Sequence, residues 1–248
     1  MEPHWEPLGP GCKVLVSPSH RFNTDTLLLA HFARPRPGEP CADLGCGCGA
    51  IALLWCHRAA PGPVVAIEIQ PEAVDLATRS VRENGLEGAI RVMQGDIRAY
   101  KSLLPHQGLG LIACNPPYFV PGTGRASADP QRAAARHGDQ LPLEALAQAA
   151  RFSLKYGGRL CVCLPAWRLA EAVVVFHQHG LEPKRLRLVQ AKPGKAPYLL
   201  LMECKSGGKP GLDVEPPLLI HEEGGDFSPE MTEIYGGYTQ GPRKGAGT

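Results

Sequence analysis

Apolar residues follow two patterns that alternate along this chain of 248 residues. Short continuous apolar runs predict buried strands at residues 41–44, 63–69, 90–96, 109–114 and 159–164. Stretches with apolar residues at helical spacing predict helices at residues 24–32, 50–56, 71–84, 143–156 and 167–179. Strands and helices that alternate in this way predict a mostly parallel sheet with helices on both faces.

Two later runs, residues 183–189 and 197–203, predict an antiparallel pair of strands at one edge of this sheet. The predicted fold is therefore α/β, a Rossmann-like, seven-stranded, mostly parallel sheet with an antiparallel edge strand and helices on both faces. Residues 1–205 are predicted to form this single domain. Residues 206–248 are predicted to form a C-terminal extension that is partly disordered, in which a stretch up to Tyr235 docks on the domain.

Two further segments are rich in residues that interrupt regular structure. Proline and glycine in residues 1–18 predict irregular structure with a short strand at residues 13–16. Residues 119–140 are polar, and a loop of this length indicates a functional lid or a flexible segment.

The composition is that of an ordinary globular protein, with 44% hydrophobic and 20% charged residues. No apolar run approaches the ~18 residues of a membrane span, and the N-terminus lacks the basic start and apolar core of a signal peptide. Nine cysteines are scattered through apolar segments, as expected in a reducing compartment. The Cys46-Gly-Cys48 pair has no second pair to complete a zinc site, so no metal is expected. We expect a cytoplasmic protein with no membrane partner.

Charge is distributed unevenly, although the net charge is only +2. Residues 125–209 carry fourteen Lys and Arg against six Asp and Glu. A basic segment suits a polyanionic partner, although a solvated surface has the same composition. The candidates for phosphate contacts are basic residues of this segment, namely Arg125, Arg132, Arg136, Lys184, Arg185 and Lys192.

A glycine-rich turn, Gly45-Cys-Gly47-Cys-Gly49, joins the first of these predicted strands to a helix. Glycines permit a tight turn and let a ligand approach the backbone closely. Glu68 lies about twenty residues further on, where an acid accepts hydrogen bonds from ribose hydroxyls. With Ala50, the glycines also satisfy the dinucleotide fingerprint. An oxidoreductase that uses a nicotinamide cofactor is therefore one hypothesis.

Three features favour S-adenosylmethionine over a nicotinamide. Asp43 precedes the glycine turn and could meet the ammonium group of this ligand, directly or through water. Asp96 ends the third strand and could accept from the adenine amine. Asn115, Pro116, Pro117 and Tyr118 end the fourth strand, and the prolines make a rigid turn. This turn presents the Asn115 side-chain carbonyl and the Pro116 backbone carbonyl as acceptors for a planar amine, next to an aromatic ring.

Together these motifs resemble the successive motifs of class I S-adenosylmethionine-dependent methyltransferases, over roughly residues 13–205. In that setting, Asn-Pro-Pro-Tyr marks enzymes that methylate adenine N6, cytosine N4 or a glutamine amide. The resemblance implies catalysis by Asn115, Pro116 and Tyr118. It implies S-adenosyl-L-methionine as cofactor, bound by residues that follow the strands, namely Asp43, Gly45, Gly47, Gly49, Glu68, Asp96 and Asn115.

The flanking residues resemble, more narrowly, the bacterial tRNA(Val) adenine-N6 methyltransferase family. The stretches that carry this resemblance are residues 21–30, 133–137 and 157–160. It implies tRNA as partner and N6-methylation of the adenine just 3′ of the anticodon. The implied substrate-binding residues follow the fourth strand and are Tyr118, Phe119, Arg125, Arg136 and His137.

Other functions are compatible with some of these features. Glutamine N-methylation of a protein is one alternative, but such enzymes usually carry a helical domain before the glycine turn, where this chain has only about forty residues. A DNA adenine methyltransferase would need a target-recognition domain, and no insertion here is large enough. A nicotinamide-dependent oxidoreductase is the alternative from another class. We expect a monomer.

Overall fold

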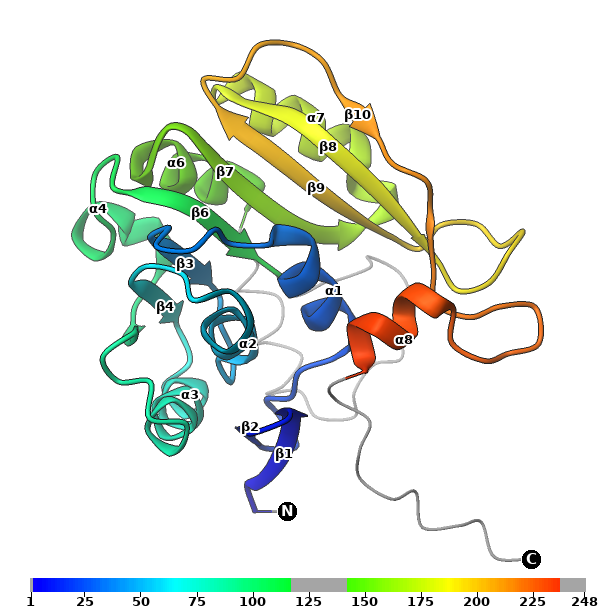
Figure 1. The fold of residues 1–248 in the computed structure, drawn as a ribbon. Coiled ribbons are helices and arrows are strands. Elements are labelled where there is room, and N and C mark those ends of the chain that lie inside the picture. The colour runs from blue at the N-terminus through cyan, green and yellow to red at the C-terminus, as the bar shows by residue number, and fades with distance from the viewer. Residues whose placement is uncertain (1, 117–141, 237–248) are drawn as a thin grey trace, which may run out of the picture.

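The computed structural model describes residues 2–116 and 142–236, and Figure 1 shows a twisted sheet with helices packed against it. Four parallel strands form one side of the sheet and begin at its edge, in the order β5 (Ile90–Gln94), β4 (Val64–Glu68), β3 (Cys41–Leu44) and β6 (Leu109–Cys114). β3 lies in the middle and pairs with β4 and β6 along its whole length. Because these strands are parallel, their carboxyl ends meet at one edge of the sheet.

The outer strands differ from the prediction in one respect. β7 (Leu154–Pro165) is parallel to β6, and β9 (Leu199–Ser206) runs antiparallel between β7 and β8 (Leu181–Gln190). The antiparallel strand therefore lies inside the sheet, between two strands that run in the opposite direction. The first four residues of β9 are all buried, whereas β8 mixes buried and half-buried residues, as expected when β9 is the more central of the two strands. Two short strands, β10 (Asp213–Val214) and β11 (Leu218–Leu219), pair with β8 and bring the sheet to nine strands among the described residues.

Helices cover both faces of the sheet (Figure 1). One face carries α1 (Thr24–Ala33), α2 (Ala50–Ala59) and α3 (Pro71–Glu83). The other carries α4 (Tyr100–Leu103), α6 (Leu143–Ser153) and α7 (Leu169–Gln178). Each face has its own buried cluster, because alternate residues of a strand point to opposite sides. No helix within the described ranges is long and apolar enough to span a bilayer.

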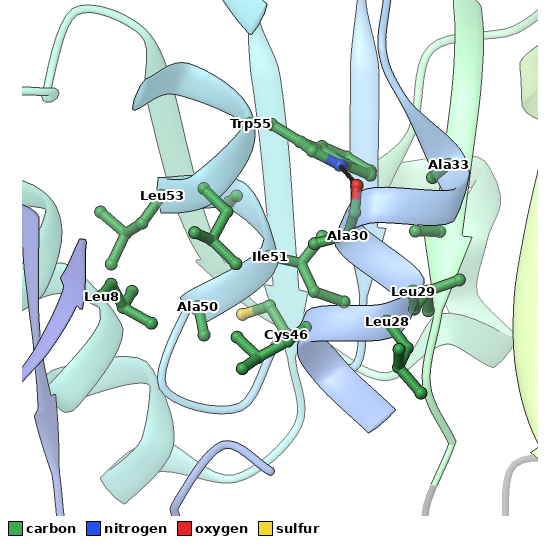
Figure 2. Close-up of a cluster of buried hydrophobic side chains, with 14 of the residues drawn as sticks. Leu8, Leu28, Leu29, Ala30, Ala33, Cys46, Ala50, Ile51, Leu53 and Trp55 are labelled. Carbon is green, nitrogen blue, oxygen red and sulfur yellow. Dashed lines mark hydrogen bonds between the residues drawn. The ribbon is translucent and has the colours of Figure 1, made fainter. Parts of the chain in front are cut away.

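Contacts between α1 and α2 hold α1 against the sheet, as Figure 2 shows. Leu28 and Leu29 of α1 belong to the same buried cluster as Ile51 of α2. Trp55 of α2 is 2% exposed, and its indole N–H donates to the Ala30 carbonyl at 3.2 Å. A buried indole N–H needs such a partner, so this bond fixes how the two helices pack.

The N-terminal segment is more regular than predicted. β1 (His4–Gly9) and β2 (Cys12–Val16) form an antiparallel hairpin. The strand predicted at residues 13–16 is therefore confirmed, whereas irregular structure over residues 4–9 was the wrong prediction. Gly11 supplies the turn with a φ of 75°. The Leu15 N–H donates to the Ser80 hydroxyl of α3 at 2.9 Å, which docks the hairpin on the domain.

The boundary between α6 and β7 also differs from the prediction. The helix ends at Ser153 instead of residue 156, and β7 begins before the glycine pair at residues 157–158. These glycines lie inside the strand, where a Cβ at Gly158 would lie 3.1 Å from the Leu109 carbonyl of β6. Gly158 therefore permits close backbone approach, and neither glycine ends the helix. A short 3₁₀ turn, η2 (Ala166–Arg168), joins β7 to α7.

A cluster of charges links the outer strands. Arg159 on β7 lies 2.8 Å from Glu39 and 3.3 Å from Glu203 on β9, and Arg185 on β8 lies 3.2 Å from Glu203. The Arg159 and Glu203 side chains are only 11% and 13% exposed. Arg185 also donates to the Phe32 carbonyl at 2.8 Å and lies over the Phe32 ring. These contacts engage the Arg185 guanidinium within the protein, and its contact with phosphate stays a prediction.

The chain after β9 packs back on the domain. α8 (Pro229–Tyr235) buries Met231 and Ile234, and the Tyr235 hydroxyl lies 2.6 Å from Thr24 Oγ1 on α1. The structure thus has the docked stretch that the sequence indicated. The domain boundary at residue 205 stays a prediction, and the last dozen residues lie outside the described ranges.

Replacing Glu203 by Gln should lower the free energy of unfolding by about 3 kcal/mol, because Arg159 and Arg185 would lose the carboxylate that they share in a mostly buried site. Urea unfolding followed by circular dichroism measures the change. The exposed Glu87 provides a control, since Glu87→Gln should alter stability by less than about 0.5 kcal/mol. Equal effects of the two substitutions would contradict a structural role for the charge cluster.

Candidate active site

A cavity of about 280 Å³ opens at the carboxyl edge of the parallel strands. Parallel sheets of this type bind ligands at this edge. The cavity is lined by the segment that leads into α1, by the glycine turn, and by the residues that follow β4, β5 and β6. Its polar and glycine residues include Arg21, Thr26, Gly45, Gly47, Glu68, Gln70, Asp96, Arg98 and Asn115.

The three glycines of the turn after β3 have two different functions in the structure. All have positive φ angles, 74° at Gly45, 54° at Gly47 and 85° at Gly49. A Cβ on Gly45 or Gly47 would meet nothing within 4 Å, so these residues leave open space in the cavity. A Cβ on Gly49 would lie 3.2 Å from the Ala77 Cβ of α3. The first two glycines therefore leave room for a ligand, whereas the third allows close packing of the helices.

Glu68 connects the glycine turn to the end of β4. One carboxylate oxygen accepts from the Gly47 N–H at 2.9 Å, and the other accepts from the N–H groups of Ile69 at 2.8 Å and Gln70 at 3.0 Å. The residue is only 8% exposed but still lines the cavity. Charge-assisted hydrogen bonds of this kind hold the carboxylate in one orientation.

Asp43 lies beneath the cavity and is not part of its lining. It is fully buried in the middle of β3. Burial raises the pKa of this carboxyl to about 7; the backbone N–H of Ala52 in α2 opposes the shift, and the nearby Glu68 carboxylate adds to it. Direct contact between Asp43 and a ligand, one of the two predicted modes, is not supported by this position. Strand pairing on both sides of Asp43 keeps it inside the sheet.

Asp96 lines the cavity after β5, as predicted, but its carboxylate already has a partner. The Arg98 Nε donates to it at 2.8 Å, and the Arg98 backbone N–H donates at 2.9 Å. The Arg98 guanidinium accordingly lowers the pKa of Asp96. These bonds arise because Asp96 caps a short 3₁₀ turn, η1 (Ile97–Ala99), which leads into α4 and was not predicted.

Asn115 and Pro116 follow β6 and line the same cavity. The Asn115 side-chain Nδ2 lies 3.4 Å from Thr26 Oγ1 of α1, so the first turn of α1 faces the end of β6. Other predicted site residues lie outside the described residues, namely Tyr118, Phe119, Arg125, Arg132, Arg136 and His137.

The model of a family described as methyltransferase small domain matches residues 20–166. The chain belongs to this family. Membership confirms the predicted methyl transfer and S-adenosylmethionine as its methyl donor, and it rules out the nicotinamide-dependent oxidoreductase.

Curated relatives of this methyltransferase match it over most of its length. A protein named tRNA1(Val) (adenine(37)-N6)-methyltransferase from Photobacterium profundum is 32% identical over 86% of this chain and 87% of its own. A protein of the same name from Porphyromonas gingivalis is 33% identical over 86% of each chain. The narrower resemblance expected from the sequence is thus confirmed.

Solved structures confirm the fold class of this methyltransferase. A predicted O-methyltransferase from Agrobacterium tumefaciens aligns with a TM-score of 0.70 at 21% identity, over 90% of this chain and 100% of its own. TrmN from Thermus thermophilus aligns with a TM-score of 0.51 at 20% identity, over 73% of this chain and 48% of its own.

The cavity of this methyltransferase has features that fit S-adenosylmethionine. The open faces of Gly45 and Gly47 leave space against the backbone, and Glu68 presents a fixed carboxylate beside them. Ile69 is 40% exposed, and it lines the cavity together with Ile97. Sequence reasoning missed both isoleucines, although each directly follows an acid at a strand end. Apolar side chains that line the cavity beside the strand ends offer a surface on which the planar adenine ring of the cofactor can pack.

The start of α1 also contributes more than the sequence indicated. Arg21 lines the cavity, whereas the nearby His20 and Asp25 do not. Thr26 lines it as well and was missed. In the described part of the chain, no group of three or more His, Cys, Asp or Glu side chains is arranged to bind a metal.

The raised pKa of Asp43 predicts that the free energy of unfolding depends on pH. Its ordinary pKa is 3.8 and its native pKa is about 7, so the native state holds the proton more tightly than the unfolded state. The stability associated with protonated Asp43 is therefore present below about pH 4 and is lost as the pH rises to about 7. Asp43→Asn carries no titrating group and should not show this loss.

Urea unfolding of both proteins, without cofactor, at several pH values between 4 and 8 measures the effect. We expect the stability of the wild-type protein relative to Asp43→Asn to fall by up to about 1.4 kcal/mol per pH unit between these two pKa values. Above about pH 7 the difference should level off. A difference that is constant from pH 4 to 8 would show that Asp43 has an ordinary pKa.

Proposed function

We propose that this methyltransferase transfers a methyl group to N6 of an adenine in tRNA, at the position just 3′ of the anticodon. The observation that carries the proposal is that Asn115 and Pro116 line the same cavity as the glycine turn and Glu68. An acceptor for an amine thereby lies next to a site suited to the methyl donor. The names of the curated relatives support tRNA and adenine N6 as the substrate.

The residues proposed to bind the cofactor lie on three neighbouring strand ends. The backbone at Gly45 and Gly47 is open to a ligand, Glu68 is placed to accept from ribose hydroxyls, and Asp96 to accept from the adenine amine. The Asp96 oxygens have lone pairs beyond those that Arg98 uses. Asp43 would contribute to cofactor binding indirectly, either through a water molecule or by supporting the glycine turn that follows it. Gly49 would contribute to the cofactor site by allowing the glycine turn to pack closely against α3.

Catalysis would come mainly from positioning, since S-adenosylmethionine, when bound, supplies a methyl group that its sulfonium already activates. The Asn115 side-chain carbonyl and the Pro116 backbone carbonyl would accept from the two N–H bonds of the exocyclic amine. This arrangement directs the lone pair of the amine nitrogen toward the methyl group of the cofactor. The same carbonyl dipoles would stabilise the positive charge that develops on the nitrogen.

No general base is required in this mechanism. The methylated amine carries an acidic proton after transfer and can release it to water. The cavity therefore needs acceptors fixed in position, which Asn115 and Pro116 supply, and it needs no group with a tuned pKa.

The RNA side of the site is proposed from the sequence. Tyr118 and Phe119 would stack on the target base, a contact that contributes about 1–3 kcal/mol per base. An unpaired base in a loop is the least costly to turn out of its stack. Arg125, Arg136 and His137 would contact phosphates, and exposed Lys192 between β8 and β9 stays a candidate for the same role.

We also propose that the protein is a cytoplasmic monomer and that its activity needs no metal ion.

Glutamine N-methylation of a protein is the competing function, because a glutamine amide is also planar and carries two N–H bonds. Incubation with labelled S-adenosylmethionine and either total tRNA or total protein separates the two. We expect label in N6-methyladenosine of digested tRNA. Label found only in protein would overturn the proposal.

Asn115→Ala should slow methyl transfer by at least about a hundredfold, as removal of a group that stabilises transition-state charge does in other enzymes. The cofactor dissociation constant, measured by calorimetry, should change less than about twofold. Gln178→Ala, at an exposed position at the end of α7, is the control and should keep full activity. Loss of cofactor affinity equal to the loss of rate would assign Asn115 to cofactor binding instead of the amine.

A further inference from the structure

The first turn of α1 is connected to Asn115 by hydrogen bonds. Thr26 lies in this turn and lines the cavity, and its Oγ1 lies 3.4 Å from Asn115 Nδ2. The same hydroxyl lies 3.0 Å from the Oδ1 of Asn23, which caps the helix. The three side chains form a continuous row from the start of α1 to the end of β6.

The direction of these hydrogen bonds follows from one backbone group. The Thr26 backbone N–H can only donate, and it lies 3.1 Å from Asn23 Oδ1. That atom must therefore be the carbonyl oxygen of Asn23. The Asn23 amide nitrogen agrees with this orientation, because it lies 3.4 Å from an Asp25 carboxylate oxygen. The Asn23 oxygen is thus an acceptor for the Thr26 hydroxyl as well.

A threonine hydroxyl has one proton and two lone pairs. Since Thr26 donates its proton to Asn23, only lone pairs remain for its other neighbours. One accepts weakly from the Asn23 N–H at 3.5 Å, and the other faces Asn115. The group of Asn115 that faces Thr26 must therefore be the NH₂, and its carbonyl oxygen is directed away from Thr26.

We propose that Thr26 is a positioning residue that sets the orientation of the Asn115 side-chain amide. This inference rests on the proposed function, in which the Asn115 carbonyl accepts from the substrate amine. With the amide reversed, an NH₂ group would face the N–H bonds of the amine, and two donors form no hydrogen bond. The cap of α1 thereby specifies that the NH₂ end of Asn115 faces Thr26 and that its carbonyl end faces away from Thr26.

Thr26→Val and Thr26→Ser test this proposal, because valine removes the hydroxyl at nearly constant shape and serine retains it. We expect Thr26→Val to lower the single-turnover rate of tRNA methylation about three- to tenfold, the effect of one neutral hydrogen bond. Thr26→Ser should stay within about twofold of wild type. The dissociation constant for S-adenosylhomocysteine and the KM for tRNA should be unchanged in both variants.

Thr24→Val is the matched control, because it removes a neighbouring hydroxyl of the same turn that bonds Tyr235 instead of Asn115. It should leave the methylation rate unchanged. Equal loss of rate in Thr26→Val and Thr26→Ser, or in Thr26→Val and Thr24→Val, would indicate a packing effect and overturn the proposal. An unchanged rate in Thr26→Val would also overturn it.

A second measurement does not depend on the substrate. In ¹⁵N-labelled protein, the Asn115 side-chain NH₂ protons should show nuclear Overhauser effects to the Thr26 methyl group, and Thr26→Val should speed their exchange with water. Absence of these effects in the wild-type protein would overturn the orientation proposed here. If wild-type protein methylates no tRNA, the proposed function fails, and this measurement still decides the inference about Thr26.

Discussion

The Glu68 carboxylate accepts hydrogen bonds from three backbone N–H groups, those of Gly47, Ile69 and Gln70. The first belongs to the turn after β3 and the others to the turn after β4, so one side chain joins two loops into a single rim. Backbone donors cannot change rotamer, and the buried carboxylate is fixed by all three. The shape of the cavity therefore depends on this acid and on the parallel pairing of β3 with β4.

The opposite side of the cavity depends on α1. Trp55 bonds this helix to α2, and Arg185 bonds its last turn from β8. Elements far apart in the sequence thus hold α1 against the domain, with its first turn next to Asn115. The cavity proposed for the cofactor and the amine therefore lies between two parts of different origin. One is the pair of loops that Glu68 joins through backbone hydrogen bonds, and the other is α1, which tertiary contacts hold in place.

This difference explains what the sequence could predict. Strand ends and the glycine turn were predicted correctly, because a continuous apolar run and the rule for parallel strands are local signals. The burial of Asp43 agrees with its place in a predicted buried strand, but its absence from the cavity lining was not predicted, since spacing from the glycines does not show which side chains face a ligand. The pairing of Asp96 with Arg98 depends on an unpredicted 3₁₀ turn. Contact of Thr26 with Asn115 joins residues 89 positions apart, and no local pattern reports it.

The central claim is that one cavity holds the methyl donor and presents the Asn115 carbonyl to the amine of an adenine. Calorimetry with a bisubstrate analogue, in which adenosine N6 is linked to the cofactor scaffold, tests it directly. The account predicts that this analogue binds wild-type protein at least about tenfold more tightly than S-adenosylhomocysteine does, and that Asn115→Ala removes the advantage. Equal affinity of the two compounds for the wild-type protein would contradict it.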